Sequence, residues 1–349
     1  MSTTETHTGE LASLRSWVAH QHLTGAFSGV LLLGRRAQPL FEQAVGMADH
    51  EHEVANTIDT RFNLGSINKT FTAVAIAQLV EANLLDFHST VSKYLPDYPN
   101  PNAARKITIH RLLTHTSGLP PYMSPEYMRE HKQIDTLDGL VRVFASKPLE
   151  FEPGSQQKYS NSGYVLLGHI IEKVVGTPYD RYVKTHVYDP AGMSHTRFED
   201  ESTLQSARGY LSAEQGGGRT FEHSPSQQHR LLPNTALLDR GNPAGGGYST
   251  AKDLLAFSEA LRTSKLLGPT MTDHILNRTF SGEQMPKYGY GLREQIVTGR
   301  RFIGNGGGAP GINSEFRFDP SGEYSAIVLS NLSPPSATSV LEHVLTVVG

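Results

Sequence analysis

The segment GSINKTFTAVAIAQLVEANLL, residues 65–85, carries the strongest helical pattern of the chain. Its apolar residues recur at the spacing of one helix face: Phe71, Val74, Ala75 and Leu79. This spacing predicts a helix with a buried side. Because Ile76 and Val80 widen the apolar face, we expect the helix to be covered on more than one side.

Strand patterns lie on both sides of this helix in the sequence. Residues 28–34 and 39–46 flank a turn at 35–38, and this short connection predicts an antiparallel pair. Further strand patterns lie near the end of the chain, at residues 289–295, 301–304, 312–318 and 324–331. Helical patterns occupy residues 11–21 and 336–348, close to the two termini.

The middle of the chain has a different character. From about residue 86 to 240, loops alternate with short helical patterns such as 109–113 and 164–175, and residues 213–219 (AEQGGGR) predict a flexible loop. We therefore expect an α/β fold in which an antiparallel sheet is flanked by helices. Residues 1–85 plus 241–349 would form this sheet domain, and residues 86–240 a mostly helical insertion, with both parts making a single unit.

The composition argues against several classes of protein. The 349 residues include 31 Lys and Arg against 34 Asp and Glu, so we expect no nucleic-acid partner. There is no cysteine, which excludes disulfides, thiolate metal sites and cysteine nucleophiles. The first ten residues lack the features of a signal peptide, and no apolar run approaches the ~20 residues of a membrane span. These features predict a cytoplasmic protein without a membrane span; nothing in them predicts an oligomeric state.

The start of the strongest helix contains a Ser-x-x-Lys pattern, Ser66 to Lys69. Residues three apart share a helix face, so the amine can lie beside the hydroxyl. A serine hydroxyl is a weak nucleophile that needs a neighbouring base, and a buried lysine can supply one because burial lowers its pKa. Alone, the pattern is more typical of a helix N-cap serine followed by a surface lysine.

Two further segments contain residues suited to chemistry. In Tyr159-Ser160-Asn161, the phenol can exchange a proton and the Asn161 amide can both donate and accept hydrogen bonds. The run from Gly304 to Gly308, interrupted only by Asn305, lies between two expected strands, and its glycines allow a close backbone approach. Taken separately, each segment is also consistent with an ordinary loop.

In this order and at these separations, the three segments resemble the serine β-lactamase and penicillin-binding-protein superfamily, and most closely its class C-like branch of esterases and D-peptidases. Four other stretches support the resemblance: LLTHTSGLP at 112–120, FEPG at 151–154, GGGYST at 245–250 followed by Asp253-Leu254, and GGAPG at 307–311. Together the matching segments span roughly residues 25–335.

The resemblance implies a role for each residue. Ser66 would be the acylated nucleophile, and Lys69 and Tyr159 would transfer protons. Asn161 would orient the substrate, while the backbone amides of Ser66 and Gly308 would form an oxyanion hole. No cofactor or metal is implied.

Asn305 departs from the superfamily pattern, which usually has Lys or His at this position. Asparagine keeps a hydrogen-bond donor but loses any positive charge. This difference weakens recognition of a substrate carboxylate and favours an uncharged ester or amide. We therefore expect a serine hydrolase of small carboxylic esters.

Other activities stay open at this point. The alternatives are a D-amino-acid peptidase or amidase, a β-lactamase-like hydrolase, an acyl transferase, and a non-catalytic binding protein on the same fold. A Ser-His-Asp hydrolase is disfavoured because no Gly-x-Ser-x-Gly occurs. The 16 histidines include no His-Glu-x-x-His pattern, so we expect no metal site. We interpret His115 as a residue that holds its loop.

Overall fold

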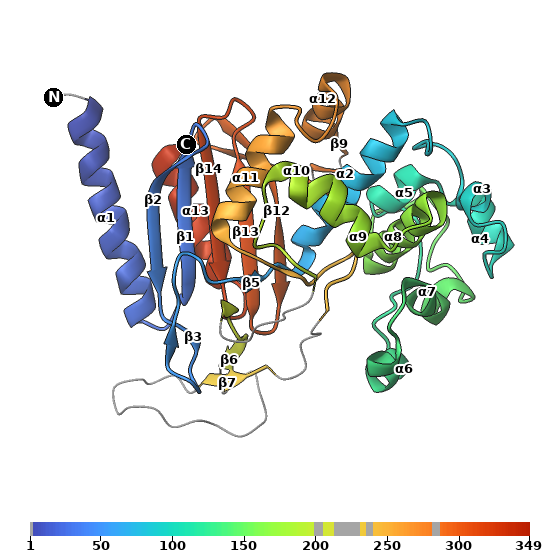
Figure 1. Cartoon of the computed structure of the whole chain (residues 1–349), viewed down its shortest axis with the longest axis horizontal. Coiled ribbons are helices and arrows are strands. Elements are labelled where there is room, and N and C mark those ends of the chain that lie inside the picture. Colours follow the sequence, from blue (N-terminus) through green and yellow to red (C-terminus); the bar gives the residue numbers. More distant parts are fainter. Residues whose placement is uncertain (1–2, 199–204, 213–230, 235–239, 281–286) are drawn as a thin grey trace.

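The computed structural model describes residues 3–198, 205–212, 231–234, 240–280 and 287–349. Its centre is an eight-stranded sheet with the strand order β2-β1-β14-β13-β12-β11-β10-β9, in which every neighbouring pair is antiparallel (Figure 1). The strands of this sheet are β1 (Gly29–Arg35), β2 (Gln38–Val45), β9 (Thr279–Phe280), β10 (Tyr288–Gly289), β11 (Arg293–Val297), β12 (Arg300–Ala309), β13 (Ile312–Phe318) and β14 (Tyr324–Ser330).

The two faces of the sheet belong to two separate hydrophobic clusters. In β1, Val30 and Leu32 pack into the larger cluster, whereas Leu31 and Leu33 pack into the smaller one. Successive side chains of a strand point to opposite faces, so a strand covered on both sides is apolar throughout. The run VLLL at residues 30–33 has this property and is fully buried.

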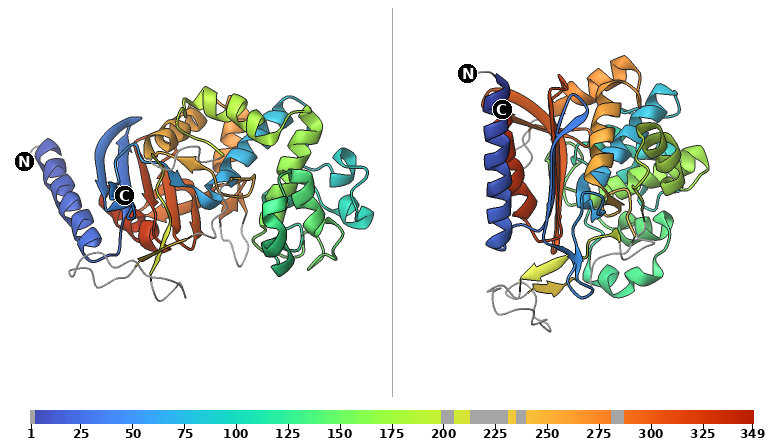
Figure 2. Two further views of the ribbon diagram at one scale, coloured as in Figure 1. Left: turned by 60° about the horizontal axis from the view of Figure 1, so that its bottom comes forward. Right: turned by 60° about the vertical axis from the view of Figure 1, so that its left-hand side comes forward.

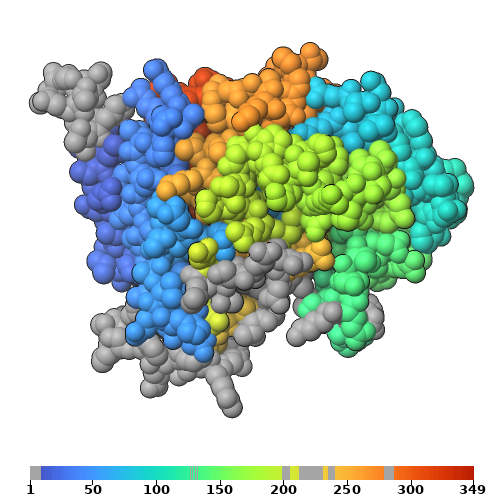
Figure 3. All heavy atoms as spheres, in the orientation of Figure 1, coloured from blue at the N-terminus to red at the C-terminus, as the bar shows by residue number. Residues whose placement is uncertain are grey.

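Helices cover both faces, which gives three layers (Figure 2). On one side lie α1 (Thr3–Leu23) and α13 (Ser336–Val348), at the two ends of the chain. The other side carries α2 (Asn68–Glu81), α8 (Asn161–Val175) and α11 (Ala251–Arg262). The yellow-green atoms of α9 (Tyr179–Val183) and α10 (Asp189–Ala191) lie on the face shown in Figure 3.

The remaining elements are short. The helices are α3 (Val91–Tyr94), α4 (Pro101–Lys106), α5 (Ile109–Leu113), α6 (Pro125–Glu130), α7 (Leu137–Ala145), α12 (Pro269–Asn277) and the turns η1 (Gly65–Ile67), η2 (His131–Gln133) and η3 (Lys184–Tyr188). The two-stranded sheets pair β3 (Met47–Asp49) with β4 (Val54–Ala55), β5 (Phe62–Asn63) with β8 (Tyr248–Ser249), and β6 (Tyr210–Ser212) with β7 (Leu231–Pro233).

The expected fold class is confirmed: an antiparallel sheet is flanked by helices, and the strands of the large sheet come from both ends of the chain. Between residues 86 and 240, the described part consists mostly of helices, from α3 to α10. The division into two domains at these residues stays a prediction. The expected loop at 213–219 lies outside the described residues. In the described part of the chain, no helix combines the length and apolar character needed to cross a membrane.

Two strand predictions were wrong. The glycine run is not a connection between strands, because β12 continues through it to Ala309 and pairs with β13 from Ile303 to Ala309. The expected strand at 289–295 is divided into β10 and β11, because the chain turns at Gly291, where φ is +71°. Glycine tolerates this conformation because it has no Cβ.

The central helix α2 is covered on more than one side, as its sequence predicts. Every residue from Asn68 to Ala77 is buried, including the polar side chains Lys69, Thr70 and Thr72. Buried polar groups need hydrogen-bond partners, so these side chains must be matched by groups on neighbouring segments.

Candidate active site

Ser66 lies in the tight turn η1, immediately before α2. Strand β12 runs directly against this turn: a Cβ on Gly307 would lie 2.1 Å from the Leu64 carbonyl oxygen and 2.7 Å from the Ser66 nitrogen. Gly65 has a φ of +51°, and a Cβ there would lie 3.3 Å from the Gly308 nitrogen. The glycines therefore let two backbone segments meet beside the serine.

The hydroxyl oxygen of Ser66 contacts two proton-carrying groups. The Tyr159 hydroxyl oxygen lies 2.5 Å from it, and the Lys69 Nζ lies 3.0 Å from it. Three residues that the sequence marks as candidates therefore meet at one atom. Both distances are within the range required for direct proton transfer.

Lys69 is fully buried, and its amine has three oxygen neighbours. Besides Ser66 Oγ, it contacts Asn161 Oδ1 at 2.7 Å and the carbonyl oxygen of Ala244. All three partners are uncharged, and burial holds the pKa of the amine well below its usual value of 10.5.

This arrangement determines where the lone pair of a neutral amine points. A neutral amine has two hydrogens, and the oxygens of Asn161 and Ala244 can only accept. When the amine donates to these two, its lone pair faces the Ser66 hydroxyl, which can donate. Lys69 is thus positioned to remove the serine proton.

Tyr159 presents its hydroxyl to Ser66, and the residue as a whole is 42% exposed. Burial of the hydroxyl end raises the pKa of Tyr159 to about 12, although the hydrogen bond with Ser66 and the charge of Arg293 lower it. The Lys69 Nζ lies 4.7 Å from the ring centroid. At neutral pH the phenol therefore keeps its proton and can donate it.

Two stretches with family-like sequence hold Tyr159 in place. The backbone of residues 114–118 bonds to that of 150–158, for example from Lys158 N to the His115 carbonyl at 2.9 Å and from Gly154 N to the Thr116 carbonyl at 2.8 Å. These contacts fix the position of residues 150–158, which directly precede Tyr159 in the sequence. The sequences around 112–120 and 151–154 thus build the support of one site residue.

His115 supports Tyr159 from behind. It is fully buried, its Nδ1 accepts the Ser160 backbone N–H at 3.0 Å, and its ring centroid lies 4.7 Å from that of Tyr159. Burial, followed by the positive charge of Lys69, lowers the pKa of His115 well below 6.5, so the ring is neutral. The interpretation that His115 holds its loop is confirmed.

Asn305 lies beneath the serine and is 5% exposed. Its Nδ2 is within donor distance of the Ser66 carbonyl (3.4 Å), Thr70 Oγ1 (3.3 Å) and the Gly291 carbonyl (3.0 Å). Its Oδ1 accepts the Gly306 N–H at 3.0 Å. The amide is directed towards α2, where it ties β12 to the turn that carries Ser66.

The segment at residues 242–247 closes the other side of the site. Asn68 Nδ2 donates to the Asn242 carbonyl at 3.2 Å, Thr72 Oγ1 donates to the Pro243 carbonyl at 2.7 Å, and Gly246 N donates to the Gly65 carbonyl at 3.1 Å. These three hydrogen bonds hold the segment so that the Ala244 carbonyl contacts the Lys69 amine. The buried polar residues of α2 therefore match backbone groups of this segment.

Sequence analysis missed three residues of the site. The Ala244 carbonyl is a backbone group, so the identity of the side chain does not predict its contact with Lys69. Arg293 is an exposed residue of β11 whose charge lowers the pKa of Tyr159, but a single arginine in a strand has no distinctive spacing. Met123, whose Sδ lies 3.9 Å from Asn161 Nδ2, belongs to a loop without a pattern.

A group of potential metal ligands lies elsewhere in the chain. Ligand atoms of Asp49, Glu51 and His52 are within 4.8 Å of one another. Arg208 already forms ion pairs with Asp49 (3.2 Å) and Glu51 (2.6 Å), so both carboxylates already have a cationic partner within the protein.

Comparison with known proteins gives a consistent family match. The sequence model of the family described as Beta-lactamase matches residues 14–347. A protein of Bacillus subtilis (strain 168) that bears the name penicillin-binding protein PbpX is 31% identical over 306 residues, which is 88% of this chain and 71% of that protein. The teichoic acid D-alanine hydrolase of Staphylococcus aureus is 29% identical over 269 residues, which is 76% of this chain and 62% of that enzyme.

A solved structure agrees with these relatives. The crystal structure of a penicillin-binding protein from Bacillus halodurans superposes with a TM-score of 0.78 at 30% identity. The match covers 93% of this chain and 98% of the other. The likeness therefore extends over nearly the whole chain, and the family match at residues 14–347 includes Ser66, Tyr159 and β12.

Proposed function

The chain belongs to the Beta-lactamase family, in the superfamily of penicillin-binding proteins and serine β-lactamases, and from this premise we propose that it hydrolyses small carboxylic esters through an acyl-enzyme on Ser66. One observation carries the proposal: the Ser66 hydroxyl oxygen lies within hydrogen-bond distance of both the Lys69 amine and the Tyr159 hydroxyl. A hydroxyl with a base on one side and an acid on the other is equipped for acyl transfer.

In the acylation step, Lys69 takes the Ser66 proton while Oγ attacks the ester carbonyl. The negative charge that develops on the carbonyl oxygen would be stabilised by the backbone N–H groups of Ser66 and Gly308. The ester C–O bond then breaks, and Tyr159 gives its proton to the departing alkoxide. Lys69 returns a proton to Tyr159, which leaves both groups neutral and the acyl group on Ser66.

In the second step, water takes the place of the alcohol. Tyr159 passes its own proton to Lys69 and accepts a proton from the water as the water oxygen attacks the acyl carbon. The bond to Ser66 breaks, Oγ recovers a proton from Lys69, and the carboxylic acid leaves. A different acceptor, such as an alcohol, would give acyl transfer by the same steps, so the choice between the two depends on which acceptor reaches the site.

The preference for an uncharged ester rests on Asn305. The superfamily usually has Lys or His at this position, and Asn305 instead uses its amide on neighbouring groups of the protein. Asn305 therefore presents no positive charge to the substrate. A neutral ester needs none, whereas a carboxylate-bearing substrate would lose a charge-assisted hydrogen bond.

A second candidate is a D-amino-acid peptidase or amidase, or a β-lactamase-like hydrolase, that acts on a carboxylate-bearing substrate. Arg293 favours it, because this exposed arginine acts electrostatically on Tyr159. The positive charge of Arg293, on β11, would take the place of the charge that Lys or His usually supplies at position 305. The name of the teichoic acid D-alanine hydrolase agrees with a D-amino-acid substrate, but that relative shares 29% identity and this chain spans 62% of its length.

A substrate panel tests the proposal and separates the candidates. Short acyl esters, a chromogenic β-lactam and D-amino-acid amides are offered to the wild type, to Ser66→Ala and to Ser13→Ala, a control at an exposed serine of α1. The proposal expects turnover of short esters in the wild type and the control, and none in Ser66→Ala. Faster turnover of the β-lactam or the amides would favour the second candidate. A non-catalytic binding protein would not react with a fluorophosphonate at Ser66.

A further inference from the structure

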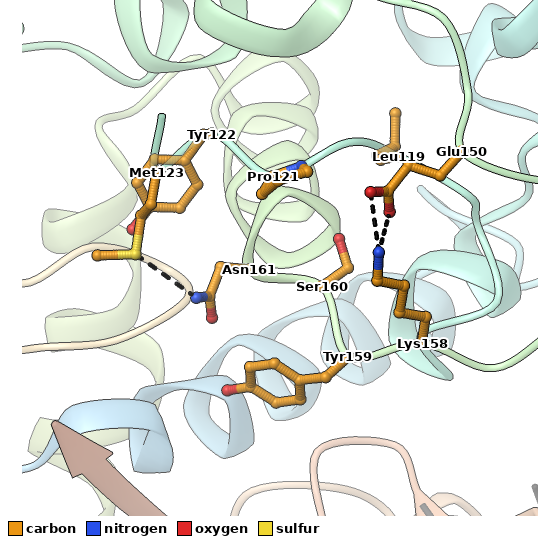
Figure 4. Close-up of a pocket in the computed structure, with 9 residues that line it drawn as sticks. All are labelled: Leu119, Pro121, Tyr122, Met123, Glu150, Lys158, Tyr159, Ser160 and Asn161. Atoms are coloured by element: carbon orange, nitrogen blue, oxygen red, sulfur yellow. Dashed lines mark hydrogen bonds and ion pairs between the residues drawn. The ribbon is translucent and has the colours of Figure 1, made fainter. Parts of the chain in front are cut away.

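A small pocket opens beside the catalytic residues. It has a volume of about 140 Å³ and is lined by Leu119, Pro121, Tyr122, Met123, Glu150, Lys158, Tyr159, Ser160 and Asn161. Figure 4 shows Met123 and Tyr122 on one side of it and the paired Lys158 and Glu150 on the other. Because Tyr159 bonds to Ser66 and Asn161 bonds to Lys69, the pocket adjoins the site at which an ester would react.

The size of the pocket limits what it can hold. A protein cavity of about 150 Å³ is large enough for one benzene molecule. A pocket of about 140 Å³ therefore accommodates a chain of about six carbon atoms or a single ring, but not a long fatty acyl chain.

The charges at the pocket are already compensated. Lys158 Nζ contacts both carboxylate oxygens of Glu150, at 2.8 and 2.9 Å. A charged substituent on the acyl group would have to separate this pair, so the pocket favours an uncharged group. The apolar side chains of Leu119, Tyr122 and Met123 offer such a group the contacts it needs.

Met123 is a half-exposed residue of the pocket lining. The residue is 50% exposed, and its sulfur accepts a hydrogen bond from Asn161 Nδ2 at 3.9 Å. While it stays in place, Met123 shortens the space available to the acyl group.

We propose that this pocket binds the acyl group of the substrate, that it selects short, uncharged acyl chains, and that Met123 determines the length limit. The inference rests on the proposed ester hydrolysis and adds its substrate class. Met123 touches the substrate without taking part in bond breaking, so its replacement should change the choice of substrate more than the chemistry.

The test compares p-nitrophenyl esters of increasing acyl length, from acetate to dodecanoate. For the wild type, kcat/KM should be highest near butanoate to hexanoate and fall by at least about tenfold towards dodecanoate, because one methylene too many in a fitted pocket already costs about tenfold or more. Met123→Ala should raise the dodecanoate-to-butanoate ratio of kcat/KM about tenfold. Met123→Leu, which keeps the size, and Met47→Ala, at an exposed methionine of β3, should both keep the wild-type profile.

A binding measurement separates this inference from the hydrolysis itself. In Ser66→Ala, hexanamide should bind at least about tenfold more tightly than acetamide, as calorimetry would show. If hexanamide binds in this way but the wild type hydrolyses no ester, the proposed reaction is wrong and the pocket assignment stands. If esters are hydrolysed but the length profile is flat, or Met123→Ala leaves it unchanged, the pocket assignment is overturned.

Discussion

Gly307 lies so close to the turn that carries Ser66 that a Cβ at this position would come within 2.7 Å of the Ser66 nitrogen. The contact joins β12 to the start of α2 at the point where the proposed nucleophile and the proposed oxyanion donors meet. Any side chain at residue 307 must push the strand away from the turn. The geometry of the site therefore depends on the absence of a Cβ at residue 307.

Gly307→Ala should lower kcat by about 10²-fold or more, because displacement of the catalytic groups by ~1 Å can cost this much. The fold should survive, since the strand can move locally. Steady-state kinetics and circular dichroism of the variant check both statements. Gly9→Ala is the matched control, because a Cβ at Gly9 has nothing within 4 Å. A Gly307→Ala enzyme with wild-type kcat would contradict the close approach.

Tyr159→Phe removes the hydroxyl next to Ser66 and keeps the ring beside His115. We expect kcat to fall by about 10²–10⁴-fold, the usual effect of losing a positioned acid or base, and we expect a similar loss for Lys69→Ala. Stopped-flow kinetics with a chromogenic short ester measures the loss. Tyr324→Phe, at a buried tyrosine of β14 outside the site, is the control and should keep full activity. Unchanged turnover in Tyr159→Phe would remove the tyrosine from the mechanism.

The lowered pKa of Lys69 makes stability depend on pH. Between the lowered pKa and about 10.5, the unfolded chain carries a proton on this lysine that the folded chain does not carry. The unfolded state then binds more protons, so its free energy relative to the folded state rises as the pH rises. Wild type should therefore gain stability relative to Lys69→Met on going from about pH 7 to pH 10.

Urea unfolding of both proteins at the two pH values checks this prediction. Lys69→Met keeps a long side chain in the space, so most packing is preserved. A difference in the free energy of unfolding that does not change with pH would mean that the folded protein keeps Lys69 charged. A charged Lys69 could not act as the base for Ser66.

Asn305→Lys would restore the charge that is usual in the superfamily. A charge-assisted hydrogen bond contributes roughly 1.5–3 kcal/mol, against about 1 kcal/mol for a neutral one. The kcat/KM for an anionic ester should therefore improve by several-fold to roughly tenfold relative to a neutral ester, and more at low salt than at high salt. Asn305→Gln controls for the longer side chain. An unchanged ratio would mean that residue 305 does not reach the substrate.

The elements with a regular apolar pattern could be predicted from the sequence. The helix at 336–348 and the strand at 312–318 have the expected bounds, because each is buried along a periodic face. Residues 305–309 were not predicted as part of strand β12, because glycine has a low strand propensity. The need for glycine there becomes visible only in the fold, where β12 packs against the η1 turn. The division of 289–295 was missed because the turn at Gly291 is set by contact with α2, where a Cβ would lie 2.8 Å from the Lys69 carbonyl.

The site could be predicted only in part. Ser66 and Lys69 are three residues apart on one helical segment, so local geometry places them together. Tyr159 is 93 positions from Ser66, and no local pattern brings it within 2.5 Å; resemblance to the superfamily selected it. The Ala244 carbonyl and the Met123 thioether belong to irregular segments whose position depends on the completed fold.

The central claim is that Ser66 carries the acyl group, and mass spectrometry tests it directly. The wild-type protein is mixed with a fluorophosphonate, digested, and its peptides are sequenced by fragmentation. We predict that Ser66 carries the label, that a short activated ester reduces the labelling by competition, and that Ser13→Ala is labelled as the wild type is. A label on another residue, or an unlabelled Ser66 in a folded protein, would contradict the account.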